Sequence, residues 1–242
     1  MSVEHRQSNT RLARRWRRVG LAAAILMCTG LGACTAVEPP TAAPTALAVD
    51  AVRLPAQDAG LDAGTYLLDR FAVPLEVTVP EGWTYHNDAV LRKDVGDTEG
   101  VFVWFGRASH VPSDACEWSG RLTEVGPSVE ALTDALTAQT STATTAPTEI
   151  TMGDYSGVEF DFSVEGVAEL DDCSQAKICI HSESISCTRW YNSSVAQRET
   201  YRVLDLDGDR AILTFGEFDD TTDAALVEEA QAVFDSITFV SD

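Results

Sequence analysis

A group of carboxylates near the carboxyl end of the chain has the spacing of calcium ligands. Asp205, Asp207 and Asp209 stand at alternate positions, as the first three ligands of a calcium-binding EF loop do. That loop also requires Gly at its sixth position and Glu at its twelfth, where this chain has Arg210 and Gly216. The flanks read as strands, and an Asp-Gly pair between strands favours a tight turn. We therefore predict a β-hairpin here and no metal site.

A cysteine near the amino terminus is placed for acylation. Residues 1–18 carry six arginines and one acid, and an uncharged run of fifteen residues, 19–33, follows. This is the pattern of an export signal, and the run is shorter than the about 20 residues of a membrane span. It ends in Leu-Gly-Ala before Cys34, which resembles the lipobox of bacterial lipoprotein signals. The resemblance implies cleavage before Cys34 and a thioether to diacylglycerol; an ordinary secretory signal or an uncleaved anchor is the alternative.

Beyond this cysteine the chain divides into a tether and one domain. Residues 34–62 are rich in Pro, Ala and Thr, a composition that cannot bury enough apolar surface to order itself. Residues 63–242 have the length of a single domain. Two or more acyl chains on Cys34 would hold the protein firmly on a bilayer. We expect an exported protein, anchored by lipid to the outer face of the bacterial cytoplasmic membrane, by either the general or the twin-arginine route.

Residues 34–242 are strongly acidic. They hold 11 basic and 37 acidic residues, a net charge of −26. Such a surface repels nucleic acid and anionic lipid headgroups, so both are excluded as charge-driven partners. The acidity would suit a binder of cations or basic partners, but a solvated surface suited to a salty environment or a GC-rich genome explains it more simply.

Four cysteines remain in the predicted domain: Cys116, Cys173, Cys179 and Cys187. An even number in an exported domain is typical of disulfides, with three pairings open. We favour Cys116–Cys173 as a long link and Cys179–Cys187 as a local one. Together with His181, three of these thiols would also supply a zinc ligand set, but the spacing lacks the paired short intervals of zinc ribbons and fingers.

The remaining residues contain no recognisable catalytic motif. There is no Gly-x-Ser-x-Gly, His-Glu-x-x-His, phosphate-binding Gly loop or Cys-x-x-Cys, and His86, His110 and His181 are isolated in the sequence. We predict no catalytic, cofactor-binding or metal site. Trp190 and Tyr191, adjacent large aromatic residues after the last cysteine, are the candidates for a binding surface, since such side chains line ligand clefts.

The apolar pattern predicts the elements that must position these residues. Strands are expected at 74–80, 101–105, 149–152, 157–164, 178–182, 199–206, 211–215 and 236–240. Helices are expected at 129–138, capped by Ser128, and at 223–235. Few helices among many sequential strands favour an α+β fold, with two main helices packed on one face of an antiparallel sheet.

Three stretches are similar to PsbP-like domains. They are the opening Val-Thr-Val-Pro-Glu-Gly-Trp at 77–83, the closing Phe-Asp-Ser-Ile-Thr-Phe at 234–239, and residues 151–160 between two cysteine regions. Several actinobacterial surface lipoproteins are similar to this fold. The resemblance covers most of residues 65–240 and implies a non-catalytic binding or assembly module without a family active site. The segment from Cys179 to Cys187 departs from the pattern.

Two functions remain open. The first is a tethered binding domain for a cell-envelope component, a partner protein or a small apolar ligand. The second is an envelope hydrolase or accessory enzyme with an unrecognised site, assembled around one of the three histidines. A histidine bonded to Ser or Asp in a concave pocket would favour the hydrolase, and histidines scattered beside a cleft would favour binding. The lack of motifs favours the binding domain.

Calcium at millimolar concentration is expected to leave the melting temperature unchanged, because a hairpin turn does not supply the remaining ligands of a calcium site. Thermal unfolding with and without calcium measures this. A stabilisation by calcium that disappears in Asp207→Asn would contradict the hairpin interpretation.

Overall fold

The computed structural model describes residues 51–55, 58–95 and 99–240. The predicted signal peptide at residues 1–33, Cys34 and most of the predicted tether lie outside the described residues. Strands β1 (Val52–Arg53) and β2 (Ala59–Gly60) and the buried Leu61 belong to the folded unit. The unit therefore includes the last part of the segment assigned to the tether.

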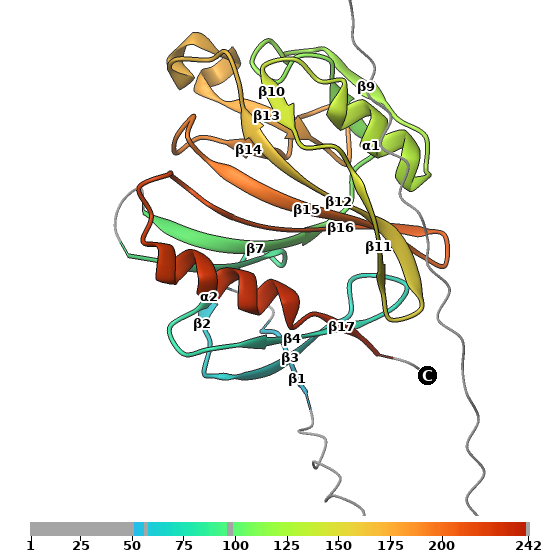
Figure 1. The fold of residues 1–242 in the computed structure, drawn as a ribbon, viewed down its shortest axis with the longest axis vertical. Coiled ribbons are helices and arrows are strands. Elements are labelled where there is room, and N and C mark those ends of the chain that lie inside the picture. The colour runs from blue at the N-terminus through green and yellow to red at the C-terminus, as the bar shows by residue number, and fades with distance from the viewer. Residues whose placement is uncertain (1–50, 56–57, 96–98, 241–242) are drawn as a thin grey trace, which may run out of the picture. The chain divides into compact units, whose positions relative to one another are not determined.

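The central sheet contains nine strands (Figure 1). In order across the sheet these are β10 (Thr142–Thr144), β12 (Tyr155–Val164), β15 (Arg198–Leu206), β16 (Asp209–Glu217), β7 (Gly100–Gly106), β6 (Val90–Asp94), β5 (Thr84–His86) and β2, with β11 (Thr148–Met152) also paired to β12. All of these pairings are antiparallel.

The other elements lie around this sheet. A second sheet has the order β1, β3 (Gly64–Leu68), β4 (Leu75–Val79) and β17 (Thr238–Phe239), and its β1–β3 pair is parallel. Two separate hairpins are β8 (His110–Pro112) with β9 (Leu122–Glu124), and β13 (Ile178–His181) with β14 (Arg189–Tyr191). The helices are α1 (Val129–Thr137), α2 (Ala224–Asp235) and the short 3₁₀ turns η1 (Leu170–Asp172) and η2 (Ser174–Ala176).

The acidic stretch near the carboxyl end forms the turn of the β15–β16 hairpin. Asp207 and Gly208 both have positive φ, 58° and 89°, as a type I′ turn requires. Asp205 accepts a hydrogen bond from the Gly208 backbone N–H at 2.6 Å, and Asp209 accepts one from Arg107 Nε at 2.7 Å. The hairpin prediction is confirmed, and the carboxylates take part in turn and ion-pair contacts.

The central sheet is buried on both faces. Tyr201 and Val203 of β15 face a core shared with α1, whereas Leu204 and Leu206 face a core shared with α2 and the second sheet. Figure 1 shows α1 and α2 on opposite sides of the long central strands. Both faces can be buried because the strand alternates its side chains between them.

A side-chain cap begins each helix: Ser128, as predicted, and Asp223, which was predicted as the first residue of the second helix. Ser128 Oγ accepts from Ala131 N at 3.1 Å, and Asp223 Oδ1 accepts from Ala225 N at 2.8 Å. Each cap satisfies a backbone N–H that has no partner within the helix. The predicted start of the first helix is thereby confirmed, and the second helix begins at Ala224, directly after its cap.

The predicted fold class is wrong. Strand is the commonest secondary structure of the described residues and is spread over several sheets. The two α-helices cover opposite faces of the central sheet rather than the same face. Strands such as β5, β8 and β14 have only three residues, too few to show a period of two. The apolar residues on both faces of β15 also indicate a sheet covered on both sides.

Two disulfides connect the elements beyond the central sheet. Cys116 pairs with Cys173 and Cys179 with Cys187, the pairing favoured from the sequence. No helix among the described residues is long and apolar enough to cross a membrane. The disulfides are consistent with a protein that folds outside the reducing cytoplasm.

Removal of the long disulfide is expected to destabilise the domain more than removal of the short one. The loops they close span 57 and 8 residues, so the loop-entropy model gives about 4 and about 2.5 kcal/mol. Urea unfolding of Cys116→Ala/Cys173→Ala and of Cys179→Ala/Cys187→Ala measures both. Equal losses, or a larger loss from the short link, would contradict the chain-entropy explanation.

Candidate functional site

A cavity of about 470 Å³ lies between the central sheet and the β13–β14 hairpin. Strands β6 and β7 contribute Arg92, Phe102 and Trp104, and the hairpin contributes Arg189 and Trp190. The other lining residues come from strand ends and loops: Arg70, His86, Asn87, Ala89, Val90, Glu183, Thr188, Asn192 and Phe218. We call this cavity the β7–β14 cleft.

Side chains on one face of β7 form the sheet side of the cleft. Val101, Val103 and Phe105 are buried in the core shared with α2, so Phe102 and Trp104 lie on the opposite face. A Cβ atom on Gly106 would lie 2.2 Å from the Trp104 ring. Only glycine therefore leaves room for the indole in this position.

One end of the cleft is both aromatic and cationic. The ring centres of Phe102 and Phe218 are 5.0 Å apart, and the guanidinium carbon of Arg92 lies 4.4 Å from the Phe218 centre. Arg92 also forms an ion pair with Asp94. These contacts hold a planar cation on an aromatic face, a favourable arrangement for both.

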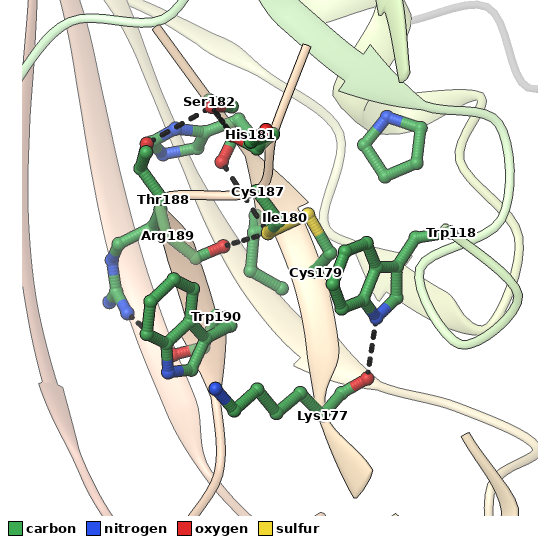
Figure 2. The surroundings of a disulfide bond; sticks show 12 residues. Trp118, Lys177, Cys179, Ile180, His181, Ser182, Cys187, Thr188, Arg189 and Trp190 are labelled. Carbon is green, nitrogen blue, oxygen red and sulfur yellow. Dashed lines mark hydrogen bonds between the residues drawn. A yellow bond between two sulfur atoms is a disulfide. The ribbon is translucent and has the colours of Figure 1, made fainter. Parts of the chain in front are cut away.

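The β13–β14 hairpin holds Trp190 in a defined place, as Figure 2 shows. The Cys179–Cys187 disulfide closes the hairpin. Lys177 Nζ lies 4.2 Å from the Trp190 ring centre, and Trp118 Nε1 donates to the Lys177 carbonyl at 3.0 Å. The indole therefore contacts the ammonium of a lysine whose backbone carbonyl is bound by a second tryptophan.

The two aromatic residues proposed for a binding surface are separated by the structure. Trp190 is half-buried and lines the cleft. Tyr191, the next residue of the strand, points the other way and is fully buried, 6.3 Å from Phe162 between ring centres. Tyr191 is therefore not a surface residue, contrary to the prediction.

A buried ion pair lies beneath the cleft. Arg189 pairs with Glu199 of β15, whose side chain is fully buried, while that of Arg189 is 12% exposed. Gln197 Nε2 donates to the same carboxylate at 3.0 Å. The Arg189 guanidinium carbon also lies 5.2 to 5.6 Å from the ring centres of Phe102, Trp104 and Tyr191. One arginine thus joins the cleft surface to the core.

The groups around this ion pair keep their protons at neutral pH. Burial, followed by the negative charge of Glu199, raises the pKa values of Tyr191 and Tyr201 well above the usual range for tyrosine. Burial opposes the charged form of Arg189, but Glu199 outweighs it and the pKa of Arg189 is raised. Tyr191, Tyr201 and Arg189 therefore stay protonated near pH 7.

Of the three histidines, His86 lines the cleft. Its Nδ1 lies 3.3 Å from Asp58 Oδ2 and its Nε2 lies 2.8 Å from Thr84 Oγ1, an order of groups that resembles a hydroxyl–histidine–carboxylate triad. However, Thr84 Oγ1 donates its one hydrogen to the Arg92 carbonyl at 3.1 Å. That hydrogen is then not directed at His86 Nε2, as activation of the hydroxyl by a base would require.

The other two histidines lie away from the cleft lining. His110 Nδ1 is 2.9 Å from Ser109 Oγ, which also bonds to the Glu183 carbonyl at 3.0 Å. His181 is fully buried, with its ring 5.3 Å from that of Trp104, and neither ring nitrogen has a hydrogen-bond partner among the described residues. Burial, followed by the charges of Arg189 and Arg210, lowers the pKa of His181 well below its usual value.

The sequence did not single out the arginines of the cleft. Arg70, Arg92 and Arg189 come from three distant segments, and nothing in their spacing suggests a cluster. The one available signal is their scarcity, because residues 34–242 contain only 11 basic residues.

Within the described parts of the chain, no group of three or more His, Cys, Asp or Glu side chains could hold a metal ion.

No protein-family model matches this chain, and no curated protein has a significant match to it. The resemblance to PsbP-like surface lipoproteins stays a prediction.

The stability of the domain is expected to fall as the pH decreases through about 6.5, the ordinary pKa of histidine. Below this pH the unfolded chain protonates His181, whereas folded His181 stays neutral because its pKa is lowered. One such group changes the free energy of unfolding by up to about 1.4 kcal/mol per pH unit. Urea unfolding between pH 5 and 8 measures the slope. His181→Leu should reduce this slope by up to about 1.4 kcal/mol per pH unit, the contribution of one proton. An unchanged slope would contradict the assignment of this pH dependence to His181.

Proposed function

We propose that this protein is a lipid-anchored, extracytoplasmic binding domain that holds a small ligand in the β7–β14 cleft. The observation that carries the proposal is the cleft itself, in which two indoles from different elements, Trp104 and Trp190, line one cavity. Its volume of about 470 Å³ lies in the range of small-molecule sites. Aromatic walls with a few polar groups are typical of such sites.

The position of the cleft suits a binding role. Its hairpin side is closed by the Cys179–Cys187 disulfide and its sheet side is part of the central sheet, so both sides are rigid before a ligand arrives. A site that is already formed loses less entropy when it binds. The export-signal pattern and the lipobox-like sequence before Cys34 support a location on the outer face of the cytoplasmic membrane, where the tether would let the domain reach its ligand.

Hydrolysis is the second candidate, because His86 contacts Asp58 and Thr84 at the edge of the cleft. The geometry supports it less well. Thr84 is not among the residues that line the cavity, and its hydroxyl hydrogen is bonded to the Arg92 carbonyl. A nucleophile must face the substrate with its proton directed at the base.

Photo-crosslinking in the native envelope tests the binding function. A benzophenone amino acid at Asn192, an exposed residue of the cleft, should form a small-molecule adduct that mass spectrometry detects on its peptide. The matched control is the same amino acid at Glu228, which is exposed on α2, on the other face of the sheet. Adducts at both positions, or none at residue 192, would overturn the proposal.

A further inference from the structure

The lining of the β7–β14 cleft is richer in basic side chains than the protein as a whole. Arg70, Arg92 and Arg189 line it, against the single carboxylate of Glu183. Residues 34–242 as a whole carry a net charge of −26. The cationic side chains in this lining favour an anion over a cation as the ligand, although the surface as a whole repels anions.

The three arginines differ in whether a carboxylate of the protein already forms an ion pair with them. Arg189 is paired with the buried Glu199, and Arg92 is paired with Asp94. Arg70 Nη1 donates to the Asp88 carbonyl at 2.7 Å, and among the described residues no carboxylate lies within ion-pair distance of Arg70. Among the described residues, Arg70 is therefore the arginine of the lining that has no ion-pair partner, which suits a ligand with one negative charge.

The rest of the lining selects a flat, apolar group. Four aromatic side chains contribute to it: Phe102, Trp104, Trp190 and Phe218. Aromatic pairs gain energy beyond the area that they bury when their rings stack or meet edge to face. Asn87, Thr188 and Asn192 add neutral hydrogen-bonding groups at the rim.

We propose that the cleft binds a small aromatic carboxylic acid, with its ring against the indoles of Trp104 and Trp190 and its carboxylate on Arg70. This inference rests on the proposed function and adds the class of ligand. A guanidinium binds a carboxylate through two parallel hydrogen bonds. The single free arginine suits a monoanion better than a phosphate, which carries more charge.

Calorimetry with a matched pair of probes tests the ligand class. In low salt the intact extracytoplasmic chain, residues 35–242, should bind 2-naphthoate at least about ten-fold more tightly than the neutral 2-naphthamide, because a hydrogen bond to a charged group is stronger than one to a neutral group. The preference should weaken in 0.5 M salt, which screens the charge.

Variants assign the preference to Arg70. Arg70→Gln should bind the acid and the amide equally, and Arg70→Lys should keep part of the preference, since it retains the charge without the planar fork. Arg121→Gln is the control, because it removes an exposed arginine that does not line the cleft. Near-ultraviolet circular dichroism and the melting temperature verify that each variant is folded.

The outcomes separate the ligand class from the function. Equal binding of acid and amide by the wild type would overturn the ligand class and leave the cleft a binding site. If neither probe binds but a small-molecule adduct forms at residue 192, the proposed ligand class is overturned and the binding function of the cleft stands. A loss in Arg121→Gln as large as in Arg70→Gln would show that the acid binds through general charge and would overturn the role of Arg70.

Discussion

The ion pair between Arg189 and Glu199 is the contact on which the cleft depends. It joins the β13–β14 hairpin to β15 of the central sheet, and the Glu199 side chain is fully buried. Leaving either charge unpaired in such a place costs about 3–5 kcal/mol, so the hairpin has one favourable position on the sheet. Because Trp190 follows Arg189 directly, the same ion pair also fixes the position of Trp190, which forms one side of the cleft.

The disulfide and the ion pair stabilise this hairpin in different ways. The Cys179–Cys187 link restricts the hairpin internally, whereas the ion pair attaches it to a different element. The three aromatic rings around Arg189 make its surroundings poor in water, which strengthens its attraction to Glu199. The charge of Arg189 is thereby offset by Glu199, and its role in the cleft is structural.

Much of the local structure could be predicted from the sequence. The Asp207-Gly208 turn and the caps at Ser128 and Asp223 are decided by neighbouring residues, so a short stretch contains all the information. The fold class could not be predicted in the same way. Strands of two or three residues, such as β2 and β5, form because of partners far along the chain, and their own pattern is too short to indicate a strand.

By itself the sequence determined an even set of cysteines, an acidic composition, a lipobox-like segment before Cys34 and the positions of two helices. Tertiary structure alone decided that Trp190 faces a cleft while Tyr191 lies in the core, and that Arg70, Arg92 and Arg189 meet there. The physical reason is distance along the chain. A cap or a turn depends on contacts between near neighbours, but a cleft consists of side chains from distant segments that only the pairing of strands brings together.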